Sequence, residues 1–145
     1  MSVPATEATD HVGYVVADLA EAKAAFARLG FVVLVEEDLG AFGLRQAMLQ
    51  SGTEKIELLR ILDPELDRAR RGDDRMRLDH VAYQVDDLEA AFLALRAAGA
   101  TVVDPIDRPI EEPLDFGDSR HLWATLGGLR LQFLQPVGQP PPQGP

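Results

Sequence analysis

The chain has 145 residues, of which 46% are hydrophobic and 26% charged, and it contains no cysteine. This size and composition suit one ordinary domain or two small modules, and the lack of cysteine excludes disulfide scaffolds, thiolate-bound zinc, iron–sulfur clusters and thiol nucleophiles. The formal net charge of −10 argues against a nucleic-acid partner, and the absence of a long apolar run or a signal-like N-terminus predicts a cytoplasmic protein with no membrane partner.

The first predicted elements are a strand and a helix. Between residues 10 and 16, apolar side chains alternate with His11 and Gly13, and alternation of this kind predicts a strand with one face in the core. Asp18, with Glu21 three residues later, has the spacing of a helix N-cap, and Gly30 stands where the helix should end.

Three strands and a charged connector should follow. The strands are expected at 31–37, 43–50 and 54–61, with a turn at 51–53. The next segment is rich in charge and poor in apolar residues, so we expect a solvated linker; its arginines could alternatively form a patch for an anionic ligand: Arg68, Arg70, Arg71, Arg75 and Arg77.

The second half of the chain repeats the first. Residues 79–102 match residues 10–33 at a constant offset of 69, with eleven identical positions among 24. Such self-similarity indicates two copies of one supersecondary unit. The copy should continue with strands at 100–104, 119–125 and 129–135, interrupted by a long loop over 105–118.

The repeat predicts an α+β fold made of two β-α-β-β-β modules. The expected organisation is an N-terminal extension over 1–8, a first module over 9–61, a linker over 62–77, a second module over 78–136, and a disordered proline-rich tail over 137–145.

Four polar residues occupy equivalent positions of the two modules. His11 and His80 are on the strand face opposite the helix, while Glu57 and Gln132 alternate with apolar residues on the last strands. Two imidazoles, a carboxylate and an amide oxygen suit a divalent first-row ion, which could be cobalt, nickel, zinc, manganese or iron. The same residues could instead provide the polar lining of a pocket for an organic ligand.

Further residues of the same face suggest catalysis and substrate binding. His121 should share this face with Trp123, and their counterparts in the first module are Gln46 and Met48. We expect His121, with Glu57, to move protons, since imidazole titrates near neutral pH. Gln46, Met48 and Trp123 are expected to line the substrate site.

Several motifs resemble a known superfamily. These motifs are D-H-V near the start of each module, K-I-E-L-L at the end of the first module and G-G-L-R-L-Q-F-L-Q-P at the end of the second. In them the chain is similar to vicinal oxygen chelate proteins, which include glyoxalases, bleomycin-resistance proteins and dioxygenases. Within this superfamily the chain most resembles methylmalonyl-CoA epimerases. The resemblance implies an eight-stranded cup-shaped mixed sheet, a homodimer, and one metal ion held by His11, Glu57, His80 and Gln132.

The resemblance also implies a reaction. We expect a divalent-metal-dependent isomerase, epimerase or lyase that acts on a small carbonyl or acyl-thioester substrate through a metal-stabilised enolate. The epimerases and glyoxalases normally place a glutamate where this chain has Gln132, and some epimerases place another near Gln46. Two alternatives stay open: an Fe(II)-dependent ring-cleaving dioxygenase with a two-histidine, one-carboxylate site, and a non-catalytic protein that binds antibiotics or other ligands.

Overall fold

The computed structural model describes residues 5–137, which group into two compact units. We call residues His11–His80 the histidine unit, and the described residues that precede and follow it the flanking unit. Strands β1 (Thr6–Val16) and β5 (Met76–Val85) each contribute residues to both units. Within the described residues, no helix is long and apolar enough to cross a membrane.

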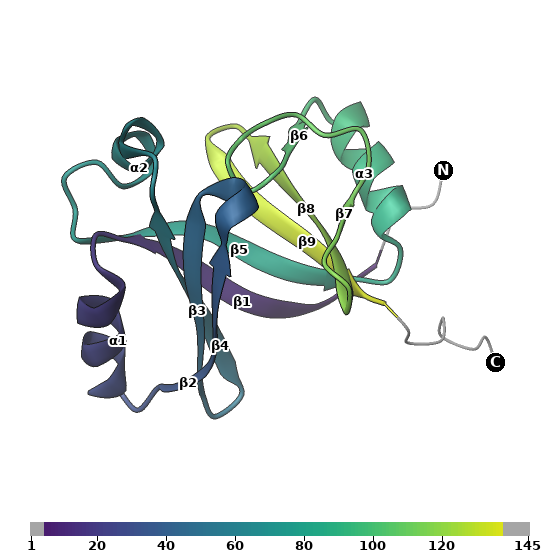
Figure 1. Ribbon diagram of the computed structural model, residues 1–145. Coiled ribbons are helices and arrows are strands. Elements are labelled where there is room, and N and C mark those ends of the chain that lie inside the picture. The colour runs from purple at the N-terminus through teal and green to yellow at the C-terminus, as the bar shows by residue number, and fades with distance from the viewer. Residues whose placement is uncertain (1–4, 138–145) are drawn as a thin grey trace. The chain divides into compact units, whose positions relative to one another are not determined.

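The histidine unit is built around four strands and two helices (Figure 1). Its strands follow the order β2-β3-β4-β1, with β1 parallel to β4 and the other pairs antiparallel. The remaining elements of this unit are α1 (Leu19–Ala27), β2 (Val32–Leu39), a 3-10 turn η1 (Gly40–Phe42), β3 (Leu44–Ser51), β4 (Glu54–Ile61) and α2 (Pro64–Arg71).

Local signals explain where α1 begins and what it covers. The side chain of Asp18 accepts a hydrogen bond from the backbone N–H of Glu21 at 2.9 Å, as the sequence predicted. Gly30 adopts a φ of 94°, which ends the helix region at low steric cost. The helix packs on the apolar face of the strands, where Val16 and Leu58 are fully buried, so the opposite face is left for polar side chains.

The flanking unit repeats this plan. Its strands follow the order β5-β9-β8-β6, with β5 parallel to β9, and β7 pairs with β8. Its other elements are α3 (Leu88–Ala97), β6 (Thr101–Val103), β7 (Leu114–Asp115), β8 (Ser119–Leu126) and β9 (Leu129–Pro136).

The flanking unit also buries one face of its sheet under a helix. Asp87 caps α3 by accepting from the backbone N–H of Ala90 at 3.0 Å. Leu122 of β8 packs with Leu88 and Phe92 of the helix. Because side chains alternate along a strand, His121 and Trp123 lie on the other face of β8, as expected.

The α+β fold of two β-α-β-β-β modules predicted from the repeat is confirmed. Six strands, β2, β3, β4, β6, β8 and β9, lie within one or two residues of the predicted ranges, whereas β5 begins at Met76, inside the expected linker, and two elements were not expected. The segment 62–77 contains helix α2, and the loop 105–118 contains the two-residue strand β7. The strand β1 begins at Thr6, inside the expected N-terminal extension, and all but the first residue of the expected disordered tail lies outside the described residues.

Candidate metal centre

Three strands bring His11, Glu57 and His80 together within the histidine unit. His11 is on β1, Glu57 on β4 and His80 on β5. In the parallel pairing of β1 with β4, Gly13 lies opposite Glu57. All three polar side chains are buried, with exposed fractions of 3% for His11, 8% for Glu57 and 2% for His80. Burial of three such groups is costly unless they are paired or coordinated.

The donor atoms of these residues converge. Nε2 of His80 lies 3.2 Å from Oε1 of Glu57, and Nε2 of His11 lies 3.8 Å from the same oxygen. The two Nε2 atoms are 3.4 Å apart. With metal–ligand distances of about 2.1 Å, neighbouring ligands of one ion stand about 3.0–3.4 Å apart. Two of the three separations are in this range and the third, 3.8 Å, is slightly wider, so the donors lie close to the spacing needed around a single first-row divalent ion.

Gly13 leaves the space that the His80 ring occupies. A Cβ atom at position 13 would lie less than 3.0 Å from three atoms of that ring. Any larger residue there would displace the imidazole. The sequence signal was the small residue next to His11 on the duplicated strand, and the structure shows which side chain needs the room.

Charges within the cluster are strongly coupled. Burial raises the pKa of Glu57, but the hydrogen bond with His80 and the charges of His11 and His80 outweigh burial, so this pKa lies below its usual range. Burial lowers the pKa of His80, whereas hydrogen bonds to Asp79 and Glu57 raise it more, to about 9. Without a metal ion, His80 is therefore protonated at neutral pH, and it donates from Nδ1 to Asp79 and from Nε2 to Glu57.

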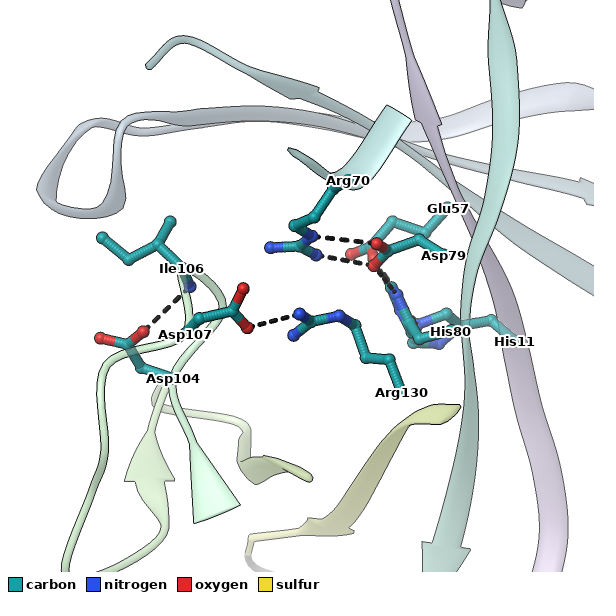
Figure 2. A network of polar contacts seen from close by, with 9 residues as sticks. All are labelled: His11, Glu57, Arg70, Asp79, His80, Asp104, Ile106, Asp107 and Arg130. Atoms are coloured by element: carbon teal, nitrogen blue, oxygen red, sulfur yellow. Dashed lines mark hydrogen bonds and ion pairs between the residues drawn. The ribbon is translucent and has the colours of Figure 1, made fainter. Parts of the chain in front are cut away.

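Asp79 and Arg70 extend this network outward (Figure 2). His80 Nδ1 donates to Oδ2 of Asp79 at 2.7 Å, and the Arg70 guanidinium donates to both oxygens of Asp79. Burial raises the pKa of Asp79, but its bonds with His80 and Arg70 dominate and hold the pKa well below its usual range. Sequence reasoning gave neither residue this role: Asp79 was only the first residue of the D-H-V motif, and nothing in the charged segment distinguishes a buried Arg70 from a solvated arginine.

Gln132 and His121 form a polar cluster inside the flanking unit. Nε2 of Gln132 donates to Nδ1 of His121 at 2.8 Å, and Nε2 of His121 then donates to Oγ of Ser119 at 2.6 Å. Gln132 is only 3% exposed, and its buried Oε1 has no hydrogen-bond partner among the described residues. A buried acceptor of this kind is costly, and a cation would satisfy it.

The expected substrate-binding residues lie in different surroundings. Met48 is opposite Glu57 in the pairing of β3 with β4, so the two side chains share a face. Trp123 is buried and stacks on His121 with ring centroids 5.9 Å apart. Gln46 instead donates to Glu37 at 3.1 Å and lines an open groove of about 280 Å³ that none of the three converging donors borders.

The arginines of the charged segment do not form a free anion patch. Each of the five is paired with a carboxylate, and only Arg70 reaches the donor cluster: Arg68 with Asp73, Arg70 with Asp79, Arg71 with Asp67, Arg75 with Glu21 and Arg77 with Asp74. Asp67 is itself buried, with an exposed fraction of 7%. The expectation of a simple solvated linker is therefore wrong for part of this segment.

Comparisons with known proteins agree with this architecture. A family model described as the glyoxalase/bleomycin resistance protein/dioxygenase superfamily matches residues 10–116. Methylmalonyl-CoA epimerase from Mycobacterium tuberculosis is 25% identical, with a TM-score of 0.76 over 94% of this chain and 93% of that chain.

Two further structures show the same fold. A variant of Streptomyces coelicolor methylmalonyl-CoA epimerase in complex with 2-nitronate-propionyl-CoA is 21% identical, with a TM-score of 0.76 over 92% of this chain and 100% of that one. A methylmalonyl-CoA epimerase in complex with methylmalonyl-CoA and NH4+ is 20% identical, with the same TM-score over 92% of this chain and 97% of that chain. Among curated proteins, none matches significantly.

Proposed function

Because the chain belongs to the glyoxalase/bleomycin resistance protein/dioxygenase superfamily, we propose that it is a divalent-metal-dependent epimerase or isomerase of a small acyl-thioester substrate. The observation that carries this proposal is the convergence of His11, Glu57 and His80 on one point within the histidine unit. The solved structures of similar fold that bind CoA esters support the substrate class.

We propose His11, Glu57 and His80 as ligands and Gln132 as a fourth. Gln132 corresponds to Glu57 in the alignment of the two modules, and its buried Oε1 lacks a hydrogen-bond partner among the described residues. His121 supports this role, because its bond to Nε2 fixes which end of the amide is left to coordinate. When bound, the ion supplies Lewis acidity that polarises a substrate carbonyl oxygen.

The chain's own residues provide proton carriers. Glu57 places a carboxylate where the three donors converge, so it can accept the α-proton of a thioester. His121 donates through Nε2 to Ser119, whose hydroxyl donates to Asp118 at 3.3 Å, and this series links the imidazole to an exposed carboxylate. Epimerisation needs removal of a proton on one face of the carbon and delivery on the other, and we propose Glu57 and His121 for these roles.

Exchange of the substrate α-proton tests the proposal. Protein loaded with Co²⁺ should exchange the α-proton of methylmalonyl-CoA for deuterium in D2O, measured by ¹H NMR, whereas protein treated with a chelator should not. His121→Ala should slow exchange by at least about 10-fold while metal binding persists. Metal-loaded wild-type protein that exchanges no faster than a protein-free control would contradict the proposed activity.

A second function is favoured by the donor set itself. Two histidines and one carboxylate are the ligands of many non-haem Fe(II) oxygenases, and His11, His80 and Glu57 are such a set. Fe(II)-dependent oxygen consumption with catechols would support a dioxygenase. Deuterium exchange under argon, with no oxygen uptake under air, would support the epimerase instead.

We also propose that the protein forms a homodimer through strand β2. This strand lies at the end of its sheet and exposes four consecutive apolar residues, Val32, Val33, Leu34 and Val35, by 62%, 47%, 49% and 42%. An apolar edge strand of this kind favours association with another chain. Sedimentation equilibrium should give a dimer that Val33→Lys converts to a monomer; a monomeric wild-type protein would contradict the proposal.

A further inference from the structure

Helix α2 reaches the donor cluster through one buried ion pair. Arg70, near the end of α2, donates from Nε to Oδ1 of Asp79 at 3.0 Å and from Nη2 to Oδ2 at 2.7 Å. The exposed fractions of the two side chains are 8% and 3%. Two parallel bonds of this kind fix both the position and the plane of a carboxylate, which a single lysine cannot do.

We propose that Arg70 and Asp79 are positioning residues that fix the His80 ring with Nε2 toward a bound metal ion. This inference rests on the proposed metal site. It assigns part of the affinity of that site for the ion to helix α2, which has no counterpart in the second module. Neither residue is proposed to touch the ion or the substrate.

The hydrogen bond from His80 determines which ring nitrogen can coordinate. A carboxylate only accepts hydrogen bonds, so the 2.7 Å contact with Oδ2 of Asp79 requires a proton on Nδ1 of His80. In a neutral imidazole the lone pair is then on Nε2, the atom that faces Glu57 and His11. Partners of this kind orient ligand histidines in metal sites and raise their affinity.

Arg70 offsets the energetic cost of burying the Asp79 carboxylate. Asp79 lies close enough to Glu57 for their negative charges to interact unfavourably, and a buried carboxylate without a cation would be strongly penalised. The guanidinium supplies the opposite charge and occupies both oxygens, yet Oδ2 still accepts from His80 (Figure 2). Arg70 therefore acts on His80 through Asp79.

The two modules differ at this point. Asp10 is the repeat counterpart of Asp79, but it accepts a hydrogen bond from Nε2 of Gln84 at 2.7 Å. The arginine that holds Asp79 comes from α2, whose segment has no counterpart in the second module. The arginine clamp is thus an addition to the duplicated plan rather than part of it.

The helix also contains a matched control. Arg71 binds Asp67 with the same two distances, 3.0 and 2.7 Å, and this pair is also largely buried, with exposed fractions of 15% and 9%. No contact joins Arg71 to His11, Glu57 or His80 in the part of the chain that the structure describes. Arg71→Lys therefore breaks a similar clamp without disturbing the donor cluster.

Cobalt titration of the full-length chain, followed by visible absorption, tests the inference. Arg70→Lys and Asp79→Asn should weaken Co²⁺ binding by about 10–100-fold, whereas Arg71→Lys should change it less than twofold. A second measurement follows the Nδ1 proton of His80 by NMR in Zn²⁺-loaded protein. This proton should exchange slowly with water in the wild type and in Arg71→Lys, and fast in Arg70→Lys.

Each outcome separates this inference from the proposed function. Wild-type protein that binds no cobalt would overturn the proposed metal site and the inference together. Wild-type protein that binds cobalt, with equal losses in Arg70→Lys and Arg71→Lys or with no loss in either, would overturn the inference alone. If circular dichroism shows that Arg70→Lys does not fold, the cobalt affinity of Asp79→Asn and the exchange rate of the Nδ1 proton in the wild type still test the inference.

Discussion

The histidine unit and the flanking unit share one plan but use it differently. In the histidine unit, β4 carries Glu57, a carboxylate within 3.8 Å of Nε2 in both His11 and His80. In the flanking unit, the equivalent strand β9 carries Gln132, an amide bound to His121. The same strand position therefore carries an anionic carboxylate in one unit and a neutral amide in the other.

Duplication and later divergence have different effects on these positions. Duplication supplies the strand positions, because the same alternation directs equivalent side chains to the face opposite each helix. Divergence then sets the charge at each position. The three donors that converge within the histidine unit include one carboxylate, so a divalent ion there would keep a net positive charge with which to polarise a substrate.

Removal of the one carboxylate should have the largest effect. Glu57→Gln makes the two units alike, and we expect Co²⁺ affinity to fall by at least about 100-fold because a neutral amide replaces a buried anion. Isothermal titration measures the loss. Glu54→Gln, an exposed change on the same strand, is the control, and equal losses in both variants would contradict the role of Glu57.

A methyl group at position 13 should disturb the histidine unit next most strongly. In Gly13→Ala the new Cβ would overlap the His80 ring, so we expect a loss of about 1–3 kcal/mol in the free energy of unfolding and weaker metal binding. Urea unfolding measures the first effect. Gly40→Ala serves as control, since its Cβ would meet only Asp38 at 3.7 Å. If Gly13→Ala has the same free energy of unfolding and the same metal affinity as the wild type, the His80 ring does not lie where the structure places it.

The stability of the metal-free protein should depend on pH through His80. Its folded-state pKa is about 9, above the ordinary value of 6.5, so the folded protein holds a proton that the unfolded chain releases. The resulting stabilisation is fully present below pH 6.5 and is lost as pH rises to 9, with a magnitude of about 3 kcal/mol.

Urea midpoints of metal-free protein between pH 6 and pH 9.5 measure this effect. The wild-type midpoint should fall across the interval, whereas the midpoint of His80→Gln should change much less. Parallel curves for the two proteins would assign the pH dependence to other groups.

Changes at Gln132 should have the smallest effect and sharpen the comparison between the units. Gln132→Ala removes one proposed neutral ligand, and we expect about a 10-fold loss of Co²⁺ affinity. Gln132→Glu should instead tighten binding, because a second carboxylate joins the site. If neither variant differs from the wild type, Gln132 is not a ligand.

Much of the fold could be predicted from sequence because the signals are local and occur twice. Asp18 and Asp87 both cap helices, and period-two alternation places His11 and His80 on the face opposite those helices. The convergence of His11, His80 and Glu57 was also predicted, since repeated strands must present equivalent positions to one face.

The remaining features depend on contacts that no local pattern encodes. Arg70 and Arg71 are adjacent and chemically identical, yet one holds Asp79 beside the donor cluster and the other holds Asp67. Which arginine does so depends on the direction of α2 relative to β5, a tertiary property. Gln46 illustrates the same limit, because its side chain is held by Glu37 of the neighbouring strand.

Metal uptake by the purified wild-type chain, prepared without a histidine tag, tests the central claim most directly. Equilibrium dialysis against Co²⁺ should give one tightly bound ion per chain, and both His80→Ala and Glu57→Gln should abolish that binding while circular dichroism shows an intact fold. Wild-type protein that takes up no stoichiometric cobalt, or a His80→Ala protein that binds it as tightly as the wild type, would contradict the claim that these buried donors form a metal centre.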